Sequence, residues 1–451
     1  MPTFLLAAAV ALAAGSAPAE PSIPFESYKL ANGLNVILSV DHSAPIVGVD
    51  VRYDVGSKDE RPGRTGFAHL FEHLMFQGTA HLPKGTADRL VEAAGGSANG
   101  GTSQDGTVYW EEVPSSALEQ VLYIEAERMG FMLPVIDQAK LDNQRDVVRN
   151  ERRQTYEMQP YGQAWKVLHE NLWDPDFPYH WLPIGEHGDL AAATLEDVRA
   201  WFRRYYGPNN ASLAIAGDFD PQEARRLVAR WFGGIPSGPP VEHARPVPRP
   251  LGAEKRVTID DQVELPRLYV AWQAPADYAP GEAELEIAAD VLSSGKSSRL
   301  VKRMVMDEQI AQGVGAFANP QRLAGEFVVI ATPKPGQDPQ RLLAEIDQEI
   351  ARLSREPPSA AELMRAKNRI ESGAVFALEP VGGFGGRAAV LNRYYFDTGD
   401  PGYLPKDLAR YRAVTAEGVR AAVASTLRPD ARVVLTVLPR KGAPVAQEGT
   451  R

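Results

Sequence analysis

The chain has 451 residues, of which 44% are hydrophobic and 24% charged, a composition typical of a globular protein of two or three domains. Its net charge of -10 argues against nucleic-acid binding, because the phosphate backbone would repel it. The sequence has no cysteine, which excludes disulfides, thiolate metal sites and a cysteine nucleophile, so a metal site would need histidine and carboxylate ligands.

The first residues are typical of a signal peptide. An apolar run over residues 4–15 is too short to span a bilayer, and the A-x-A-like segment Ser16–Ala19 follows it. We therefore expect a signal peptide over residues 1–19, cleaved before Glu20, and export of the mature chain to a periplasm or a similar space. The opening Met-Pro-Thr lacks a basic residue, so a disordered alanine-rich tail is the alternative.

The mature chain begins with sheet-forming segments. Residues 28–40 predict two strands around an Asn32–Gly33 turn, and residues 46–55 alternate apolar and polar like a further strand. The stretch Gly66–Thr79 then predicts a buried helix, because its apolar residues recur at three- and four-residue steps.

Three ionisable residues stand within this apolar helix. His69 and His73 lie at i and i+4 and so share one face, which Glu72 also reaches. Two imidazoles at this spacing can hold one metal ion, and a nearby carboxylate can take a proton from a metal-bound water. The pattern H-x-x-E-H is the inverted form of a zinc peptidase motif. The alternative, hydrogen-bonded polar groups without a metal, would bury three ionisable groups at a high energetic cost.

The rest of the first half predicts helices and strands in alternation. Its glycine-rich stretch at 97–106 lets another backbone approach closely, and the residues after it alternate like a strand. Gln144 and Glu151 are two turns apart in a predicted helix and share a face. Helices are expected over 86–94, 118–132 and 137–156 and again from residue 192, followed by a strand over 211–216.

The second half repeats the end of the first half. Thr194–Ala200 matches Thr415–Ala421 without a gap, and Pro208 falls on Pro429 at the same offset, which indicates an internal duplication. We therefore predict an α+β fold of two homologous domains, each a mostly antiparallel sheet with helices packed on one face. The expected boundaries are a catalytic domain over 22–235, a Pro- and Gly-rich linker over 236–254 and a homologous C-terminal domain over 255–440.

The chain resembles the pitrilysin/insulinase family of inverted-zincin metallopeptidases, in the half-length group that includes the mitochondrial processing peptidase. Residues Gly66–Thr79 are close to the family signature G-x-A-H-x-x-E-H-x-x-F-x-G-T, and Arg145–Glu151 matches its distal R-D-V-[IV]-x-x-E helix. The resemblance implies half of a clam-shaped peptidase with one Zn²⁺ per chain. Its implied site residues are His69, His73 and Glu151 as metal ligands, Glu72 as catalytic base, and Ala98, Asn99 and Gly100 on a strand that pairs with substrate.

Two departures from the family pattern affect the expected site. Gln144 stands where the family often has a second glutamate, and is expected to support the metal ligands by hydrogen bonding. An Arg and a Tyr of the family's second half, seven residues apart, align with Val305 and Gln312, although Arg303 lies close by. The sequence thus predicts a zinc endopeptidase acting on peptides or unfolded segments. The partner implied is a second subunit, in a dimer or in a heterodimer whose other chain lacks H-x-x-E-H; the alternative is a non-catalytic structural or peptide-binding subunit.

Overall fold

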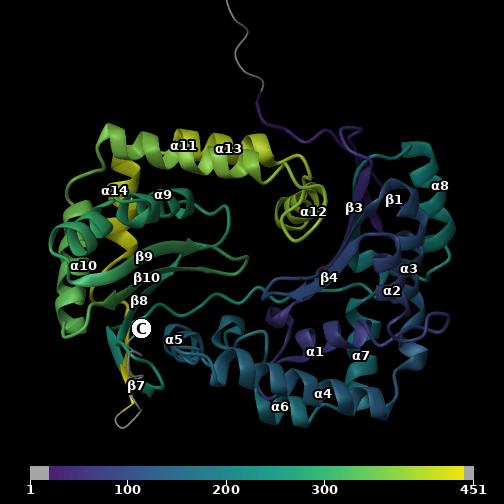
Figure 1. Cartoon of the computed structure of the whole chain (residues 1–451), viewed down its shortest axis with the longest axis horizontal. Coiled ribbons are helices and arrows are strands. Elements are labelled where there is room, and N and C mark those ends of the chain that lie inside the picture. The colour runs from purple at the N-terminus through teal and green to yellow at the C-terminus, as the bar shows by residue number, and fades with distance from the viewer. Residues whose placement is uncertain (1–19, 441–451) are drawn as a thin grey trace, which may run out of the picture.

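The computed structural model describes residues 20–440, so the predicted signal peptide lies outside the described residues. Two lobes, each built on one sheet, face each other across the molecule in Figure 1. The first sheet has the order β1-β2-β6-β3-β5-β4, which makes β4 an edge strand. Its strands are β1 (Glu26–Lys29), β2 (Asn35–Val40), β3 (Ile46–Tyr53), β4 (Ser97–Thr102), β5 (Thr107–Pro114) and β6 (Ala211–Gly217).

The second sheet repeats the topology of the first. Its order is β7-β11-β8-β10-β9, in which only β7 and β11 run parallel, just as only β2 and β6 do in the first sheet. The expectation of two related, mostly antiparallel α+β halves is therefore confirmed. The strands are β7 (Lys255–Asp261), β8 (Arg267–Ala274), β9 (Ala311–Asn319), β10 (Gly325–Pro333) and β11 (Val433–Pro439).

Amphipathic helices cover one face of each sheet. Their apolar side chains pack against every second side chain of the strands, and both sets are thereby buried from water. Helices of the first half are α1 (Phe67–Met75), α2 (Thr86–Ala93), α3 (Leu118–Phe131), α4 (Gln138–Arg152), α5 (Ala164–Leu172), α6 (His187–Ala191), α7 (Leu195–Tyr205) and α8 (Pro221–Phe232). Those of the second half are α9 (Glu282–Ser293), α10 (Pro339–Leu353), α11 (Ala360–Phe376), α12 (Arg387–Thr398), α13 (Leu404–Ala413) and α14 (Ala416–Thr426). No helix within residues 20–440 is long and apolar enough to cross a membrane.

Each half contributes one helix that packs on the sheet of the other half. Helix α5 packs on β8 and β11, and α12 packs on β3 and β6, so both sheets are covered on their second face as well. Buried Asn392 of α12 donates to the backbone carbonyl of Asp50 at 2.9 Å and to that of Ser212 at 3.2 Å. Because these polar atoms are satisfied inside the core, the exchange fixes how the two halves sit against each other.

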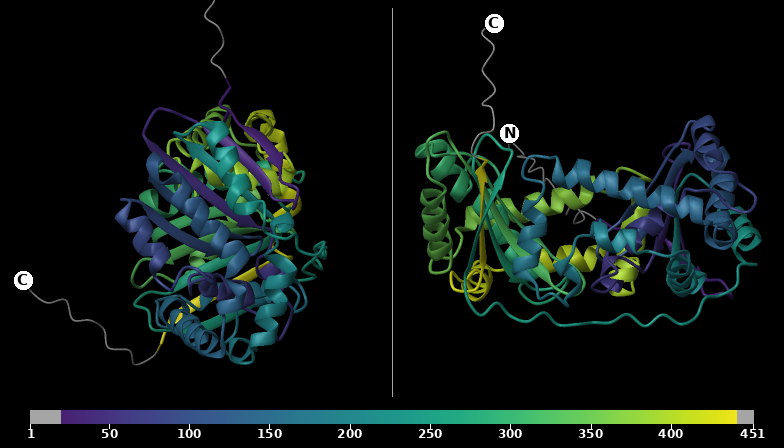
Figure 2. Two further views of the ribbon diagram at one scale, coloured as in Figure 1. Left: turned by 90° about the vertical axis from the view of Figure 1, so that its right-hand side faces the viewer. Right: turned by 90° about the horizontal axis from the view of Figure 1, so that it is seen from below.

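A second junction joins the halves beside β4. Asp105, in the turn between β4 and β5, accepts hydrogen bonds from the Tyr179 hydroxyl at 2.7 Å and from the backbone N–H of Arg322 at 3.0 Å. The Arg322 guanidinium reaches Asp54 at 2.5 Å and Asp397 at 3.1 Å. The edge strand is thereby anchored to the second half at one end. The linker 236–254 runs as an extended segment along one side of the molecule (Figure 2).

Candidate metal centre

Helix α1 carries the H-x-x-E-H residues, and buried groups fix its position. The Glu60 carboxylate accepts hydrogen bonds from the first free N–H groups of the helix, those of Gly66 at 3.0 Å and Ala68 at 2.8 Å. These hydrogen bonds satisfy donors that have no partner within the helix, and they oppose the rise in the pKa of Glu60 that burial causes. Gly66 has a φ of 83°, and a Cβ there would lie 2.9 Å from the carbonyl oxygen of Ile184, so no larger residue fits.

The structure brings His69, His73 and Glu151 together from two helices. Glu151 lies in the last turn of α4, which packs against α1. Its carboxylate oxygens stand 3.7 Å from Nε2 of His69 and 3.2 Å from Nε2 of His73. One ligand atom from each residue lies within 4.8 Å of the others, and within residues 20–440 this is the one such group of three or more donors.

These donors fit a zinc ion. Tetrahedral zinc with bonds of about 2.0–2.2 Å separates its ligand atoms by roughly 3.3–3.6 Å, close to the spacing of the imidazole and carboxylate atoms here. The Nδ1 atom of His69 is buried without a hydrogen-bond partner, so nothing in the described chain fixes the tautomer of this ring. Three protein ligands leave a fourth position open, as in catalytic rather than structural zinc sites.

The protonation of the metal-free site follows from its burial and charges. Burial lowers the pKa of His69 to about 4, so this imidazole is neutral and able to bind a metal. Burial also lowers the pKa of His73, but the hydrogen bond and the charge of Glu151 outweigh it and raise that pKa overall. The hydrogen bond from His73 lowers the pKa of Glu151 in turn. A metal ion would take the place of the shared proton.

Glu72 lies beside the donor cluster and is held by a residue that the sequence did not single out. The Thr102 hydroxyl, at the end of β4, donates to Oε2 of Glu72 at 2.7 Å. Burial raises the pKa of Glu72, and this hydrogen bond opposes the rise. The available signal was strand alternation, since Ala98, Gly100 and Thr102 fall on the same face of β4.

The predicted substrate strand borders the same cavity. A cavity of about 620 Å³ contains His69, Glu72, His73 and Glu151, and the residues of β4 from Asn99 to Thr102 line it. Ala98 packs against the first core, and a Cβ on Gly100 would approach Phe76 of the motif segment to 3.1 Å. The glycine therefore lets the edge strand lie close to the metal helix.

Gln144 lies at the metal cavity, whereas the expected second-half positions Val305 and Gln312 do not line it. Buried Gln144 lines the metal cavity together with Glu151. Its side-chain amide donates a hydrogen bond to Oδ1 of Asn143 at 2.8 Å. Val305 packs against the second core, whereas Gln312 lies on β9. Arg303 is already paired, with Glu349 at 3.1 Å, with Glu308 at 3.2 Å and with Glu345.

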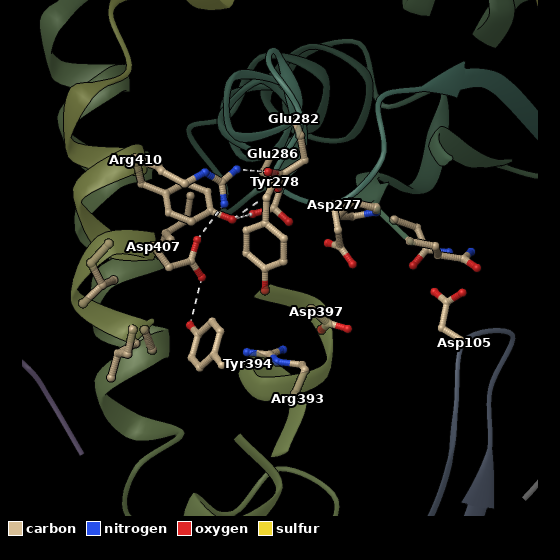
Figure 3. A pocket seen from close by; sticks show the side chains of 18 of the residues that line it. Asp105, Asp277, Tyr278, Glu282, Glu286, Arg393, Tyr394, Asp397, Asp407 and Arg410 are labelled. Atoms are coloured by element: carbon tan, nitrogen blue, oxygen red, sulfur yellow. Dashed lines mark hydrogen bonds and ion pairs between the residues drawn. The ribbon is translucent and has the colours of Figure 1, made fainter. Parts of the chain in front are cut away.

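A second cavity, of about 520 Å³, lies where the β4–β5 turn meets the second half. Figure 3 shows Asp105, Asp277 and Asp397 around this space, each from a different segment. Burial and the neighbouring carboxylates raise the pKa of Asp277 to about 7. None of the expected metal ligands lines this cavity, so it is separate from the candidate metal centre.

Comparisons with known proteins place this geometry in a family. Residues 35–176 match the family described as Insulinase (Peptidase family M16), and residues 192–370 match the one described as Peptidase M16 inactive domain. The "Zinc protease PqqE" of Helicobacter pylori is 31% identical over 353 residues, which cover 76% of this chain and 77% of that protein. The chain belongs to the M16 peptidase family, as the signature residues predicted.

Two further similarities agree with this assignment. The "Probable mitochondrial-processing peptidase subunit beta" of Arabidopsis thaliana is 27% identical over 365 residues, covering 78% of this chain and 67% of that protein. The crystal structure of a protease from Helicobacter pylori has a TM-score of 0.86 and 25% identity, and the match covers 93% of this chain and all of that one. The chain is thus a half-length member of the family, and the predicted fold is confirmed.

Proposed function

We propose that this protein is a zinc-dependent endopeptidase that hydrolyses peptides or unfolded protein segments. One observation carries the proposal: His69, His73 and Glu151 converge in a cavity where Glu72 lies beside the unpaired edge of β4. His69, His73 and Glu151 would hold the ion. When bound, zinc supplies a Lewis acid that polarises the scissile carbonyl and acidifies the attacking water.

The residues of the chain support the remaining chemistry. An extended peptide pairs with the free N–H and C=O groups of β4, which binds its backbone with little dependence on sequence. Glu72, held by Thr102, takes the proton of the attacking water and returns it to the leaving nitrogen. Burial raises the pKa of Glu72, which makes its carboxylate a stronger proton acceptor than that of an exposed glutamate.

The competing function is a non-catalytic structural or peptide-binding subunit of the same fold. Helix α9 follows β8 as α1 follows β3, yet α9 has no histidine, so the second half illustrates a metal-free version of the domain. The first half differs from it by retaining all three donors and Glu72, which favours the enzyme.

Peptide digestion read by mass spectrometry separates the two functions. Zinc-loaded protein should cut an unfolded polypeptide at internal bonds, lose this activity when a chelator removes the metal, and regain it when zinc is restored. A zinc-loaded protein that binds the polypeptide but leaves it intact would support the non-catalytic subunit. Cleavage that persists without measurable metal would contradict the role of zinc.

We also infer that the chain works with a second subunit. The family's Arg and Tyr positions align with Val305 and Gln312, and Arg303 is held by three carboxylates, so a second copy would not offer these groups. A heterodimer with a homologous subunit lacking H-x-x-E-H would supply them. Light scattering together with activity before and after adding such a partner tests this, and full turnover by an isolated monomer would contradict it.

Export is a separate proposal that rests on the sequence of residues 1–19. Protein recovered from its native cell should begin at Glu20 when its N-terminus is sequenced. Protein that still begins at Met1 or Pro2 would contradict export.

A further inference from the structure

A glycine-rich loop of the second half reaches the substrate edge of the first half. Residues 382–386, Gly-Gly-Phe-Gly-Gly, connect α11 to the exchanged helix α12. The backbone N–H of Gly382 donates to Oε2 of Glu112 at 3.1 Å, and that of Arg387 donates to the carbonyl of Pro380 at 3.0 Å. Both ends of the loop are therefore fixed, and Phe384 stands between them.

The Phe384 ring lies against β4 and stays half open to solvent. A Cβ added to Gly101 would stand 2.8 Å from a ring carbon of Phe384, so the ring covers the place where a side chain would be. The Trp110 ring packs edge-on against it, with centroids 5.6 Å apart and planes at 75°. Phe384 is nevertheless 54% exposed. A large ring held in place but left open has apolar area available for a ligand.

The geometry of the strand gives this ring a definite relation to a bound peptide. Residues 99–102 all border the metal cavity along the free edge of β4, but their side-chain directions alternate. The side-chain positions of Gly100 and Thr102 point toward α1 and Glu72, whereas that of Gly101 points to the opposite face, where Phe384 lies. A peptide that extends the sheet at β4 continues this alternation. Its side chains therefore point in turn toward the metal cavity and toward the face of Phe384 and Trp110.

We propose that Phe384 and Trp110 form a specificity subsite that takes an aromatic or large aliphatic side chain of the bound peptide, on the face of β4 away from the metal. The inference rests on the proposed function, because it assumes a peptide on β4. Gly101 has no side chain that could compete for the ring, and aromatic pairs gain energy beyond their buried area. The second half of this chain thus contributes to peptide selection within one subunit.

Matched peptides and variants test the subsite. A wild-type digest of a peptide library first shows at which peptide position the side chain is selected. Two peptides of equal length, both cleaved in a zinc-dependent way, then carry Phe or Ala at that position. We expect Phe384→Ala to lower kcat/KM for the Phe peptide about 3- to 10-fold and to change the Ala peptide less than 2-fold. Phe384→Leu should recover part of the preference. Phe376→Ala, which removes a ring that is 65% exposed at the end of α11, serves as the control and should leave both rates unchanged.

A double-mutant cycle checks that the ring acts from its place on β4. Gly101→Ala puts a methyl group into the ring position and should reduce the preference for Phe as Phe384→Ala does. In the Phe384→Ala background the same methyl group has room, so its effect on the preference should disappear. Additive effects of the two substitutions on the preference would overturn the subsite.

The experiment distinguishes failure of the subsite from failure of the proposed function. Equal loss for both peptides, or no change in either, would overturn the subsite while leaving the peptidase intact. If the wild-type protein cleaves no peptide of the library, the proposed hydrolysis fails. The binding of two extended peptides of equal length, with Phe or Ala at alternate positions, is then measured instead by fluorescence anisotropy. Tighter binding of the Phe peptide that Phe384→Ala abolishes would then support the subsite, and equal binding of both peptides would overturn it.

Discussion

The hydroxyl of Thr102 is the residue-scale feature that connects peptide binding to the proposed chemistry. It lies on the strand that would pair with the peptide and donates a hydrogen bond to the proposed base, Glu72, at 2.7 Å. This hydrogen bond restricts the orientation of the Glu72 carboxylate, which lines the metal cavity. Pairing of a peptide with β4 and orientation of the base therefore depend on the same few residues.

Removal of this hydroxyl should reduce turnover rather than binding. Thr102→Val keeps the size and branching of the side chain but loses the donor, and we expect kcat to fall about 10-fold with KM changed less than 2-fold. Thr102→Ser keeps the donor and should retain most of the activity. Steady-state kinetics on samples of equal zinc content provides the measurement. A Ser variant as impaired as the Val variant would show that packing, not the hydrogen bond, matters.

At the residue scale the sequence predicted the part of the site that lies on one helix. His69, Glu72 and His73 share a face through helical spacing alone. Glu151 is about eighty residues away and was assigned only through the resemblance to a family, because no periodicity relates α4 to α1. Thr102 and Phe384 were missed, since a hydroxyl in a strand and a ring in a loop gain a role only from what packs against them.

At the scale of elements, a buried charged cluster supports the strand next to β4. Arg128 of α3 is 4% exposed, pairs with Glu125, and reaches Oε1 of Glu111 on β5 at 3.4 Å. Its guanidinium also lies 4.9 Å from the ring centres of Phe76 and Tyr109. One cation thus links helix α3, strand β5 and the end of the motif segment.

Loss of this cation should destabilise the first half. Arg128→Met keeps the apolar contacts of the side chain but leaves two buried carboxylates without their partner, so we expect the free energy of unfolding to fall by about 3–5 kcal/mol. Chemical denaturation of variant and wild type gives the difference. The control is Arg230→Met, because Arg230 pairs with Glu119 where both side chains are about half exposed, and it should change stability by less than about 1 kcal/mol. Equal effects of the two substitutions would contradict a structural role for the cluster.

The helices and strands were predicted best where the hydrophobic periodicity continues over many residues. Helices α2, α3 and α7 and strands β3 and β6 lie close to their expected ranges. Helix α4 ends at Arg152 rather than near 156, because the chain widens into a π-helical turn over 153–157. The sequence predicts little of the structure of residues 293–415. It does not predict that α5 and α12 each pack on the sheet of the other half, since periodicity shows that a helix has an apolar face but not which sheet that face covers.

For the molecule as a whole, the acidic cavity between the halves should make stability depend on pH. Asp277 faces the carboxylates of Asp397, Glu282 and Asp105, which together with burial raise its pKa to about 7, and Arg393 acts in the opposite direction. The folded protein therefore keeps this proton up to about pH 7, whereas the unfolded chain releases it near pH 4. The contribution of Asp277 to the stability of the wild-type protein should therefore fall as the pH rises through this window.

Substitution of Asp277 by Asn should remove this loss. Between pH 5 and pH 8 we expect Asp277→Asn to gain on the order of 1–3 kcal/mol in unfolding free energy relative to the wild type, after allowance for solvent screening. Urea titrations of both proteins at pH 5 and at pH 8 measure this change in unfolding free energy. Asp430→Asn, at an exposed carboxylate paired with Arg428, should show no such gain and serves as the control. Parallel pH curves for wild type and Asp277→Asn would contradict the raised pKa.

The roles of zinc and Glu72 in hydrolysis are tested by measuring metal content and peptide cleavage on the same samples. Glu72 is proposed as the base but not as a ligand, so Glu72→Gln should retain about one zinc per chain and lose peptide cleavage. Glu151→Gln, in contrast, should lose both zinc and peptide cleavage, because it weakens a ligand that approaches both histidines. Elemental analysis and a mass-spectrometric digest give both quantities for each variant. A Glu72→Gln protein that holds zinc and still cleaves at the wild-type rate would show that Glu72 is not the base.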